Sequence, residues 1–310
     1  MTIRDLEIFV TVAENGKIGT AAKKLYISQP TVSHAISQIE EKYHVKLFER
    51  LSRKLYITDV GREFLNYARH ILANFREMEH YLNHASEQIC IYIGASLTVG
   101  SFFLGKIISK FENRNPMIST RVYIDNSKNI IKKIFEGTID IAIIEGYINS
   151  EDIISEEVYQ DEMVIICGRS HPFANKKCVC LSDLKNMDFV LREEGSGTRD
   201  FSINLTERRG IPIVEKWVCH SSDSIINIVA AGQGISIISK SLVINQNKVV
   251  QIPIKDFPLY RSFKIIYHKD KYISSPIKKL ITEIKHDFNS EFVDIRNKDV
   301  KNLSLKHPIQ

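Results

Sequence analysis

The stretch from residue 21 to residue 33 decides the fold of the N-terminal region, and it reads Ala21-Ala22-Lys23-Lys24-Leu25-Tyr26-Ile27-Ser28-Gln29-Pro30-Thr31-Val32-Ser33. Its first five residues have the apolar spacing of a short helix, and Tyr26-Ile27 is a tight turn. Ser28 can then cap a second helix with its hydroxyl. Pro30 fits the first turn of that helix, because the N–H that proline lacks would have no partner there. The stretch therefore predicts two short helices joined by a tight turn.

A third helix precedes this pair. Leu6, Phe9, Val10 and Ala13 recur at the spacing of one helix face, and Asn15-Gly16 is typical of a helix end. Three short helices with a tight turn before the last one fit a helix-turn-helix, whose last helix enters the major groove of DNA. Short polar side chains there can hydrogen-bond to base edges. The candidate DNA contacts of this helix are Ser28, Gln29, Pro30, Thr31, Ser33, His34 and Ser37.

Residues 46–58 follow the last of these helices and alternate basic with apolar side chains. This pattern is typical of a small β-wing that lies on a phosphate backbone. Residues 1–58 hold nine Lys and Arg against six Asp and Glu, a net charge of +3. Contact with nucleic acid must therefore come from a local basic patch. The candidate phosphate contacts are Lys46, Arg50, Arg53 and Lys54.

Taken together, these motifs resemble the N-terminal winged helix-turn-helix of LysR-type transcriptional regulators. The resemblance rests on Ala-Ala-x-x-Leu-x-x-Ser-Gln-Pro at residues 21–30 and Leu-Phe-x-Arg at residues 47–50, and it extends over nearly the whole chain. One departure is Lys42-Tyr43-His44-Val45, where the family usually has a Leu-Gly turn. The resemblance implies a sequence-specific, DNA-binding regulator of transcription. Its expected partners are double-stranded DNA, a small-molecule effector, further copies of itself and RNA polymerase.

Residues 59–87 are expected to form a linker helix that mediates dimerisation, as in the family. The stretch has one Gly near its start, no Pro, and apolar residues in steps of four and three, which is typical of a seam between two helices. A helix of ~27 residues is about 40 Å long, more than a small domain covers. The alternative is that the seam packs on its own domain. The seam residues are Phe64, Ala68, Ile71, Phe75, Met78 and Leu82.

From Ile89 onward the pattern becomes α/β. Apolar runs such as residues 139–144 predict buried strands, and amphipathic segments such as residues 98–111 predict the helices between them. Two blocks of alternating strands and helices indicate two doubly wound lobes. The resemblance adds that this region is an effector-binding domain similar to a periplasmic binding protein. The expected fold class is thus α/β, with an all-α winged helix-turn-helix at the N-terminus.

The expected organisation has four parts: the DNA-binding domain at residues 1–58, the linker helix at 59–87, the effector-binding domain at 88–292 and a C-terminal tail at 293–310. The chain is expected to cross between the lobes near Asp161 and near His268. Lobe 1 then holds about residues 88–161 and 269–292, and lobe 2 about residues 162–268. The tail loses apolar periodicity after about Ser290 and is expected to be frayed.

Polar segments follow three predicted strands, at the places where ligands sit in open α/β sheets. Hydroxyls and free N–H groups at a helix start favour an anion, and Arg199 could add a bidentate contact. The alternative for any one segment is helix capping alone. With the resemblance, the segments predict an anionic effector held between the lobes. The candidate contacts are Ser96, Thr98, Asn126, Ser127, Glu145, Ser196, Thr198 and Arg199.

Composition excludes several other classes. The 310 residues are 44% apolar and 25% charged, as in an ordinary globular protein of two or three domains. The five cysteines are odd in number, which argues against a disulfide framework, and Cys178-x-Cys180 has no second pair with which to bind a metal. The first residues carry charges where a signal peptide needs an apolar run. We therefore expect a cytoplasmic protein that does not span a membrane.

Two further functions are open at this point. In an enzyme, the Gly-Ser-Gly-Thr loop at residues 195–198 could cradle a phosphate, but the chain has no Walker lysine, no Gly-x-Ser-x-Gly and no His-Glu-x-x-His motif. No catalytic residue, cofactor or metal is therefore expected. A solute-binding protein for transport fits the two α/β lobes, but the missing signal peptide and the basic N-terminal region oppose it.

Overall fold

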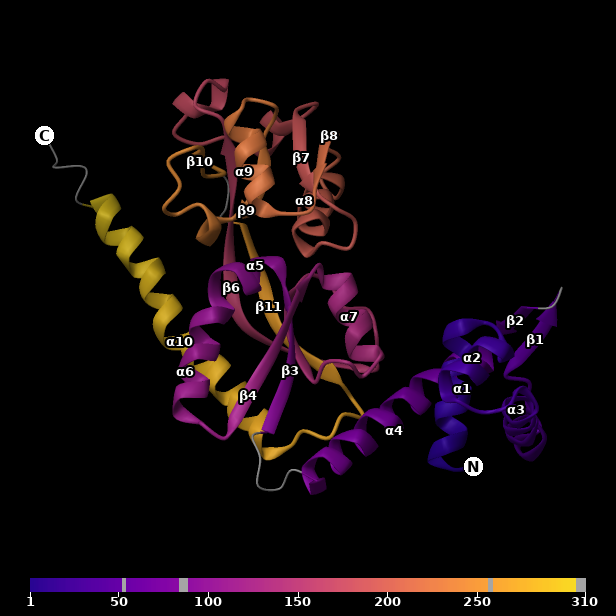
Figure 1. Cartoon of the computed structure of the whole chain (residues 1–310). Coiled ribbons are helices and arrows are strands. Elements are labelled where there is room, and N and C mark those ends of the chain that lie inside the picture. Colours follow the sequence, from indigo (N-terminus) through magenta and orange to yellow (C-terminus); the bar gives the residue numbers. More distant parts are fainter. Residues whose placement is uncertain (52–53, 84–88, 256–258, 305–310) are drawn as a thin grey trace, which may run out of the picture. The chain divides into compact units, whose positions relative to one another are not determined.

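The computed structural model describes residues 1–51, 54–83, 89–255 and 259–304, with the side chains of 50, 51, 54, 77, 80, 81, 83 and 291–304 outside the description (Figure 1). The chain divides into two compact units, the first centred on residues 1–87 and the second on most of the remainder. Among the described residues, no helix is both long enough and apolar enough to cross a membrane.

The first unit is a winged helix-turn-helix followed by a long helix, so the expected architecture of this region is confirmed. Its elements are α1 (Ile3–Asn15), α2 (Ile18–Leu25), α3 (Gln29–Tyr43), β1 (Phe48–Leu51), β2 (Lys54–Ile57) and α4 (Asp59–Asn83). The two strands form an antiparallel hairpin in which Phe48 faces Ile57. Phe9 is fully buried at the centre of the unit, and its ring lies 5.4 Å from that of Phe48.

Local signals in the sequence fix where these helices begin and end. The Ser28 hydroxyl accepts the N–H of Thr31 at 3.2 Å, which caps α3 as expected. At the other end His44 closes α3 with φ +54° and donates its N–H to Glu40 and Glu41 carbonyls. A histidine therefore takes the left-handed position that glycine usually fills, and this accounts for the departure from the Leu-Gly turn.

The long helix α4 corrects part of the dimer-seam prediction. Ala68 and Leu72 are buried in the core of the first unit, and the Phe64 ring lies 4.6 Å from that of Phe9. Phe64 and Ala68 therefore pack on their own domain, because the first turns of α4 lie against α1. Farther along, Ile71, Met78 and Leu82 are exposed in the single chain. The alternative in which the seam packs on its own domain therefore applies to the first part of the helix, and the dimer seam stays a prediction for the rest.

The second unit is an α/β domain. Its elements to the end of the first long strand are β3 (Ile89–Ser96), α5 (Leu97–Val99), η1 (Gly100–Leu104), α6 (Gly105–Arg114), β4 (Ile118–Asp125), α7 (Ser127–Phe135), β5 (Ile141–Glu145) and β6 (Ile153–Cys167). It continues with η2 (Pro172–Asn175), η3 (Leu181–Leu184), β7 (Asp188–Arg192), α8 (Gly197–Glu207), β8 (Val214–Cys219), α9 (Ser222–Ala230), β9 (Ser236–Ser239), η4 (Lys240–Leu242), β10 (Val250–Ile252), β11 (Leu259–His268) and α10 (Ser275–Ser304).

One seven-stranded sheet runs through both lobes of this unit, in the order β10-β6-β11-β5-β3-β4 with β9 also paired to β6. Strands β4, β3 and β5 are parallel, whereas β11 and β6 are antiparallel to their neighbours. The sheet is therefore mixed rather than wholly parallel. The 15-residue strand β6 passes from one lobe into the other, and β11 pairs with its residues 153–163 (Figure 1).

Separate apolar cores define the two lobes. The core of lobe 1 contains Ile91, Phe103 and Ile143, and it extends to Phe263 and Ile265 of β11. Lobe 2 has apolar clusters on both faces of its part of the sheet, around Ile165 and Phe189 on one face and Ile166 and Val229 on the other. Because Phe263 already belongs to lobe 1, the chain returns at about Arg261 and not near His268 as expected.

One other expectation needs correction. The tail expected to fray after about Ser290 continues as helix α10 to Ser304. Residues 277–304 contain no Gly or Pro, so the loss of an apolar stripe removes a packing face without breaking the helix.

Candidate functional site

The N-terminal half of α3 presents one polar face. Gln29, Pro30, Thr31 and His34 are exposed, as is the capping residue Ser28, whereas Ser33 and Ser37 are half-buried. The opposite face is buried in the core of the first unit through Val32, Ala35, Ile36 and Ile39. The helix is therefore held firmly from one side, and its polar residues are free to contact an external surface.

Gln29, Pro30 and Ser33 line a shallow hollow of about 620 Å³ together with Ile18. Gly19 leaves room for the Gln29 side chain, since a Cβ there would lie 3.3 Å from the Gln29 amide nitrogen. The start of α2 and the start of α3 thus form one continuous surface. A side chain at residue 19 would compete with Gln29 for its position.

A half-buried carboxylate holds the wing against this helix. Glu40 of α3 accepts the backbone N–H groups of Leu47 and Phe48 at 2.8 and 3.2 Å, and its other oxygen lies 3.4 Å from Lys46 Nζ. Gly61 packs close by, because a Cβ there would lie 2.3 Å from the Leu47 carbonyl oxygen. Of the predicted phosphate contacts, Lys46 is exposed, the side chains of Arg50 and Lys54 lie outside the described atoms, and Arg53 lies outside the described residues.

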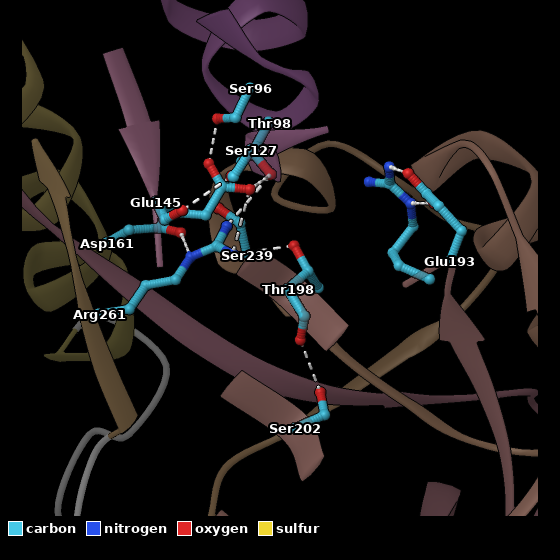
Figure 2. A network of polar contacts seen from close by, with 11 residues as sticks. Ser96, Thr98, Ser127, Glu145, Asp161, Glu193, Thr198, Ser202, Ser239 and Arg261 are labelled. Atoms are coloured by element: carbon cyan, nitrogen blue, oxygen red, sulfur yellow. Dashed lines mark hydrogen bonds and ion pairs between the residues drawn. The ribbon is translucent and has the colours of Figure 1, made fainter. Parts of the chain in front are cut away.

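A second polar site lies where the two lobes meet. We call it the junction cluster, and Figure 2 shows its side chains converging on one point. Lobe 1 supplies residues from the starts of α5 and α7 and the end of β5, and lobe 2 supplies the start of α8 and the end of β9. The members are Ser96, Thr98, Ser127, Glu145, Asp161, Thr198, Ser239 and Arg261.

Arg261 is the centre of the junction cluster. Its Nε donates to Asp161 Oδ2 at 2.8 Å, and its Nη1 and Nη2 donate to Thr198 Oγ1 at 2.8 Å and Thr98 Oγ1 at 3.2 Å (Figure 2). Thr98 belongs to lobe 1 and Thr198 to lobe 2, so one guanidinium joins hydroxyls from both lobes. The fixed fork of arginine suits such a role, because its donors point in several directions at once.

Glu145 and Asp161 are the two carboxylates of the cluster, and both are buried, at 2% and 0% exposure. Glu145 accepts the hydroxyls of Ser96 and, at 3.3 Å, Thr98, and its Oε1 lies 3.6 Å from Arg261 Nη1. Burial raises the pKa of the Asp161 carboxyl, although the Arg261 charge and the Ser239 hydroxyl oppose the rise. Ser239 donates to Asp161 at 2.6 Å.

Several hydroxyls in this region are not used for helix capping. Ser96 occupies the cap position of α5 and Ser196 that of α8, yet neither side chain makes a capping hydrogen bond. Ser96 instead donates to Glu145, and Ser127 donates to the Glu145 carbonyl oxygen at 2.8 Å. Capping, the simpler explanation of these residues, therefore does not account for Ser96.

Arg199 and Asn126 lie apart from the cluster. Thr198 and Arg199 are consecutive residues of α8 and point in different directions, so the Arg199 guanidinium pairs with Glu215 and the Arg192 carbonyl. Arg199 therefore does not point into the junction cluster, where it was predicted to make a bidentate contact with an effector. Asn126 caps α7 through the N–H of Asn129.

A buried pair, Arg192 and Glu193, lies near Asn126. Arg192 donates to both oxygens of Glu193 at 2.8 Å. Burial raises the pKa of the Glu193 carboxyl, but hydrogen bonds from Arg192, its own N–H and Asn126 outweigh burial and hold that pKa below its usual value. The pair is therefore a neutralised ion pair beside the junction cluster.

Sequence reasoning missed three members of the junction cluster: Arg261, Ser239 and the role of Asp161. One signal was available for Arg261, because it alternates in phase with Leu259 and Phe263 on β11, and both of those are buried. A charged residue on the inward face of a strand requires a partner. Among the described residues, no group of three His, Cys, Asp or Glu side chains is placed to hold a metal ion.

A winged helix-turn-helix with an exposed polar face, in one chain with a two-lobed α/β domain, defines a class of DNA-binding regulators that carry a sensing domain. Comparison with known families agrees. Residues 3–62 match the bacterial regulatory helix-turn-helix protein, lysR family, and residues 87–289 match the LysR substrate binding domain. The chain belongs to the LysR family and is a LysR-type transcriptional regulator with an effector-binding domain.

Characterised relatives share this organisation over most of their length. The RuBisCO operon transcriptional regulator of Allochromatium vinosum is 27% identical in an alignment of 279 residues, which covers 88% of this chain and 92% of that protein. The HTH-type transcriptional regulator CysL of Bacillus subtilis is 27% identical over 300 residues, 93% of this chain and 98% of the relative.

Solved structures share the fold. A full-length OxyR from Pseudomonas aeruginosa, carrying a cysteine-to-aspartate substitution, has a TM-score of 0.67 at 22% identity, covering 92% of this chain and 95% of that one. Full-length CbnR complexed with its target DNA has a TM-score of 0.62 at 21% identity, with coverages of 92% and 99%. The regulatory domain of CcmR from Synechocystis, in complex with 2-PG, has a TM-score of 0.62 at 21% identity and covers 66% of this chain and 99% of that domain.

Proposed function

We propose that this regulator binds specific DNA sequences through the N-terminal half of α3 and that a small molecule held between the lobes of the second unit modulates this activity. One observation carries the first part: α3 buries its apolar face and exposes Gln29, Thr31 and His34 on the other. Such side chains hydrogen-bond to base edges in the major groove, and Gln suits adenine. CbnR, which shares the fold, is known as a complex with its target DNA.

The wing supplies the contacts that carry no sequence information. Lys46 is exposed beside the start of β1, and Arg50, Arg53 and Lys54 are expected from the sequence to contact phosphates with it. Each such contact releases condensed counterions from DNA, so it contributes about 0.9 to the slope of log affinity against log salt concentration. Affinity and salt dependence together therefore test the wing assignment.

A second copy of the chain is the proposed partner of α4. Ile71, Phe75, Met78 and Leu82 continue the steps of four and three beyond the part of α4 that packs on its own core, and three of the four are exposed. A paired seam of this kind buries side chains that a monomer leaves in water. The dimer would place two α3 helices on DNA half-sites about one helical turn apart.

The effector is proposed to bind at the junction cluster, where hydroxyls of both lobes meet. The regulatory domain of CcmR, which shares the fold, binds 2-PG. A ligand there would favour one arrangement of the lobes over another, and it must bind that arrangement more tightly to shift the equilibrium. We further propose that the protein acts in the cytoplasm, on promoters read by RNA polymerase.

The DNA-binding proposal is tested by fluorescence anisotropy with DNA fragments enriched from a randomised library by the full-length protein. The wild type should enrich a palindromic sequence and bind it with a steep salt dependence. Arg53→Ala should weaken binding and lower the slope by about 0.9, and Arg208→Ala, an exposed arginine of the second unit, should change neither. No enriched sequence would contradict the proposal, and an unchanged slope for Arg53→Ala would show that the wing assignment is wrong.

A further inference from the structure

The position at the start of α5, where an anion would be expected to bind, is already occupied by a carboxylate of the protein. Ser96 and Thr98 stand at the start of the helix that opens with α5, a place where hydroxyls and the helix dipole favour a negative charge. The Glu145 carboxylate accepts both of these hydroxyls. Figure 2 shows this carboxylate between the start of α5 and the Arg261 guanidinium. Glu145 therefore has the contacts that a bound anion would make.

The junction cluster contains two carboxylates and one cation. Glu145 and Asp161 each carry a negative charge when ionised, and Arg261 is the one cation among the eight members of the cluster. Arg261 is closer to Asp161, at 2.8 Å, than to Glu145, at 3.6 Å. Its donors are also shared with Thr98 and Thr198. An incoming anion would therefore meet the Glu145 carboxylate at the start of α5, beside an arginine that already donates to Asp161, Thr98 and Thr198.

Lobe 2 lies directly against the backbone and Cγ of Glu145. A Cβ on Gly197 would lie 2.5 Å from the Glu145 carbonyl oxygen and 2.6 Å from its Cγ. Glycine at residue 197 thus allows the start of α8 to approach Glu145 closely. In this arrangement, Glu145 cannot turn toward α8 to make room for a second negative group.

From these contacts we propose that Glu145 determines the charge of the effector: it excludes anions from the junction cluster and selects a ligand that presents a hydrogen-bond donor, a hydroxyl or an ammonium group, to its carboxylate. The inference rests on the proposed effector site and makes its ligand class specific. It replaces the anionic effector expected from the sequence. That expectation rested on the helix starts and their hydroxyls, and it did not include the Glu145 carboxylate that already accepts those hydroxyls.

The test measures binding of two defined anions, sulfate and inorganic phosphate, to the full-length protein at pH 8 and constant ionic strength, by calorimetry and by the shift in melting temperature. The wild type should show no saturable binding at millimolar concentrations. Glu145→Gln keeps the shape and removes the charge, and it should bind the anions about a hundredfold more tightly than the wild type, as expected for removing a like charge ~5 Å away in a partly screened interior. The control is Glu194→Gln, which removes a carboxylate from an exposed position and should behave as the wild type.

Location is tested by adding Thr98→Ala to Glu145→Gln, which should abolish the gained binding. If Glu145→Gln does not fold, Glu145→Ser removes the same carboxylate with a smaller polar side chain and carries the same expectation. Binding of sulfate or phosphate by the wild type that depends on Thr98 would overturn the inference while leaving the proposed effector site in place. A Glu145→Gln protein that gains no more than Glu194→Gln, or whose gain survives Thr98→Ala, would overturn it as well.

Discussion

Replacing Arg261 with methionine tests whether the junction cluster holds the two lobes together. The change removes the hydrogen bonds from Arg261 to Asp161, Thr198 and Thr98 and leaves two buried carboxylates without their cation. Removal of one partner from a buried ion pair typically costs ~3–5 kcal/mol, because the remaining charge is still out of water. We expect a loss of about this size at pH 8 for the second unit.

The loss should also depend on pH. Burial already raises the pKa of Asp161, so ionising this group opposes folding. Stability from such a group is complete below its unfolded pKa of about 3.9 and is lost as the pH rises through its folded pKa. Without Arg261, that folded pKa moves further up. The destabilisation of Arg261→Met should therefore be larger at pH 8 than at pH 5, where a carboxylic acid is more easily kept neutral.

Urea unfolding followed by tryptophan fluorescence measures this directly. The chain has one tryptophan, Trp217, and it lies on β8, so the signal reports on the second unit. Arg114→Met is the matched control, because Arg114 pairs with Glu283 at the surface and its side chain is 61% exposed. That control should lose at most about 1 kcal/mol. An Arg261→Met protein no less stable than the control, or equally destabilised at both pH values, would refute the reasoning.

Three further changes test other parts of the structure. Glu40→Ala leaves the N–H groups of Leu47 and Phe48 without an acceptor, so it should lower the free energy of unfolding by about 1–3 kcal/mol and weaken DNA binding. The control Glu41→Ala, at an exposed position, should change neither the thermal melt nor the anisotropy. Gly61→Ala should destabilise the first unit by at least ~1 kcal/mol, and Gly105→Ala, which meets nothing within 4 Å, should stabilise α6 by up to about 1 kcal/mol in calorimetric scans. Ile71→Lys puts a charge into the proposed seam and should shift sedimentation equilibrium toward the monomer with the fold intact; an unchanged mass would exclude Ile71 from the interface.

The first unit was largely predictable because its signals are local. Ser28, Pro30 and the helical spacing of Val32 and Ile36 fix one helix, and short-range rules govern each of them. The division of α4 could not be predicted in the same way. The step pattern is continuous from Phe64 to Leu82, and only the tertiary packing of Phe9 shows where the helix leaves its own core.

In the second unit, long-range contacts decide the site. The hydroxyls at residues 96, 98 and 198 could be proposed from their places before helices, but Arg261 reaches them from a strand more than sixty residues farther along the chain than Thr198. No local pattern pairs Asp161 with Arg261 or places Glu145 against Ser96. The sequence thus predicted where polar residues gather, while the charge balance of the site required the fold.

The central claim is that the exposed face of α3 recognises DNA sequence, and comparison of the sites selected by the wild type and by Gln29→Ala tests it most directly. Both full-length proteins would be used to enrich sites from one randomised library, with Lys46→Ala as the control for phosphate contact. Gln29→Ala is expected to lose a base preference at one position of each half-site, and Lys46→Ala is expected to select the same sequence as the wild type with weaker binding. If Gln29→Ala selects an unchanged sequence with unchanged affinity, the face of α3 that we assign to base recognition is wrong.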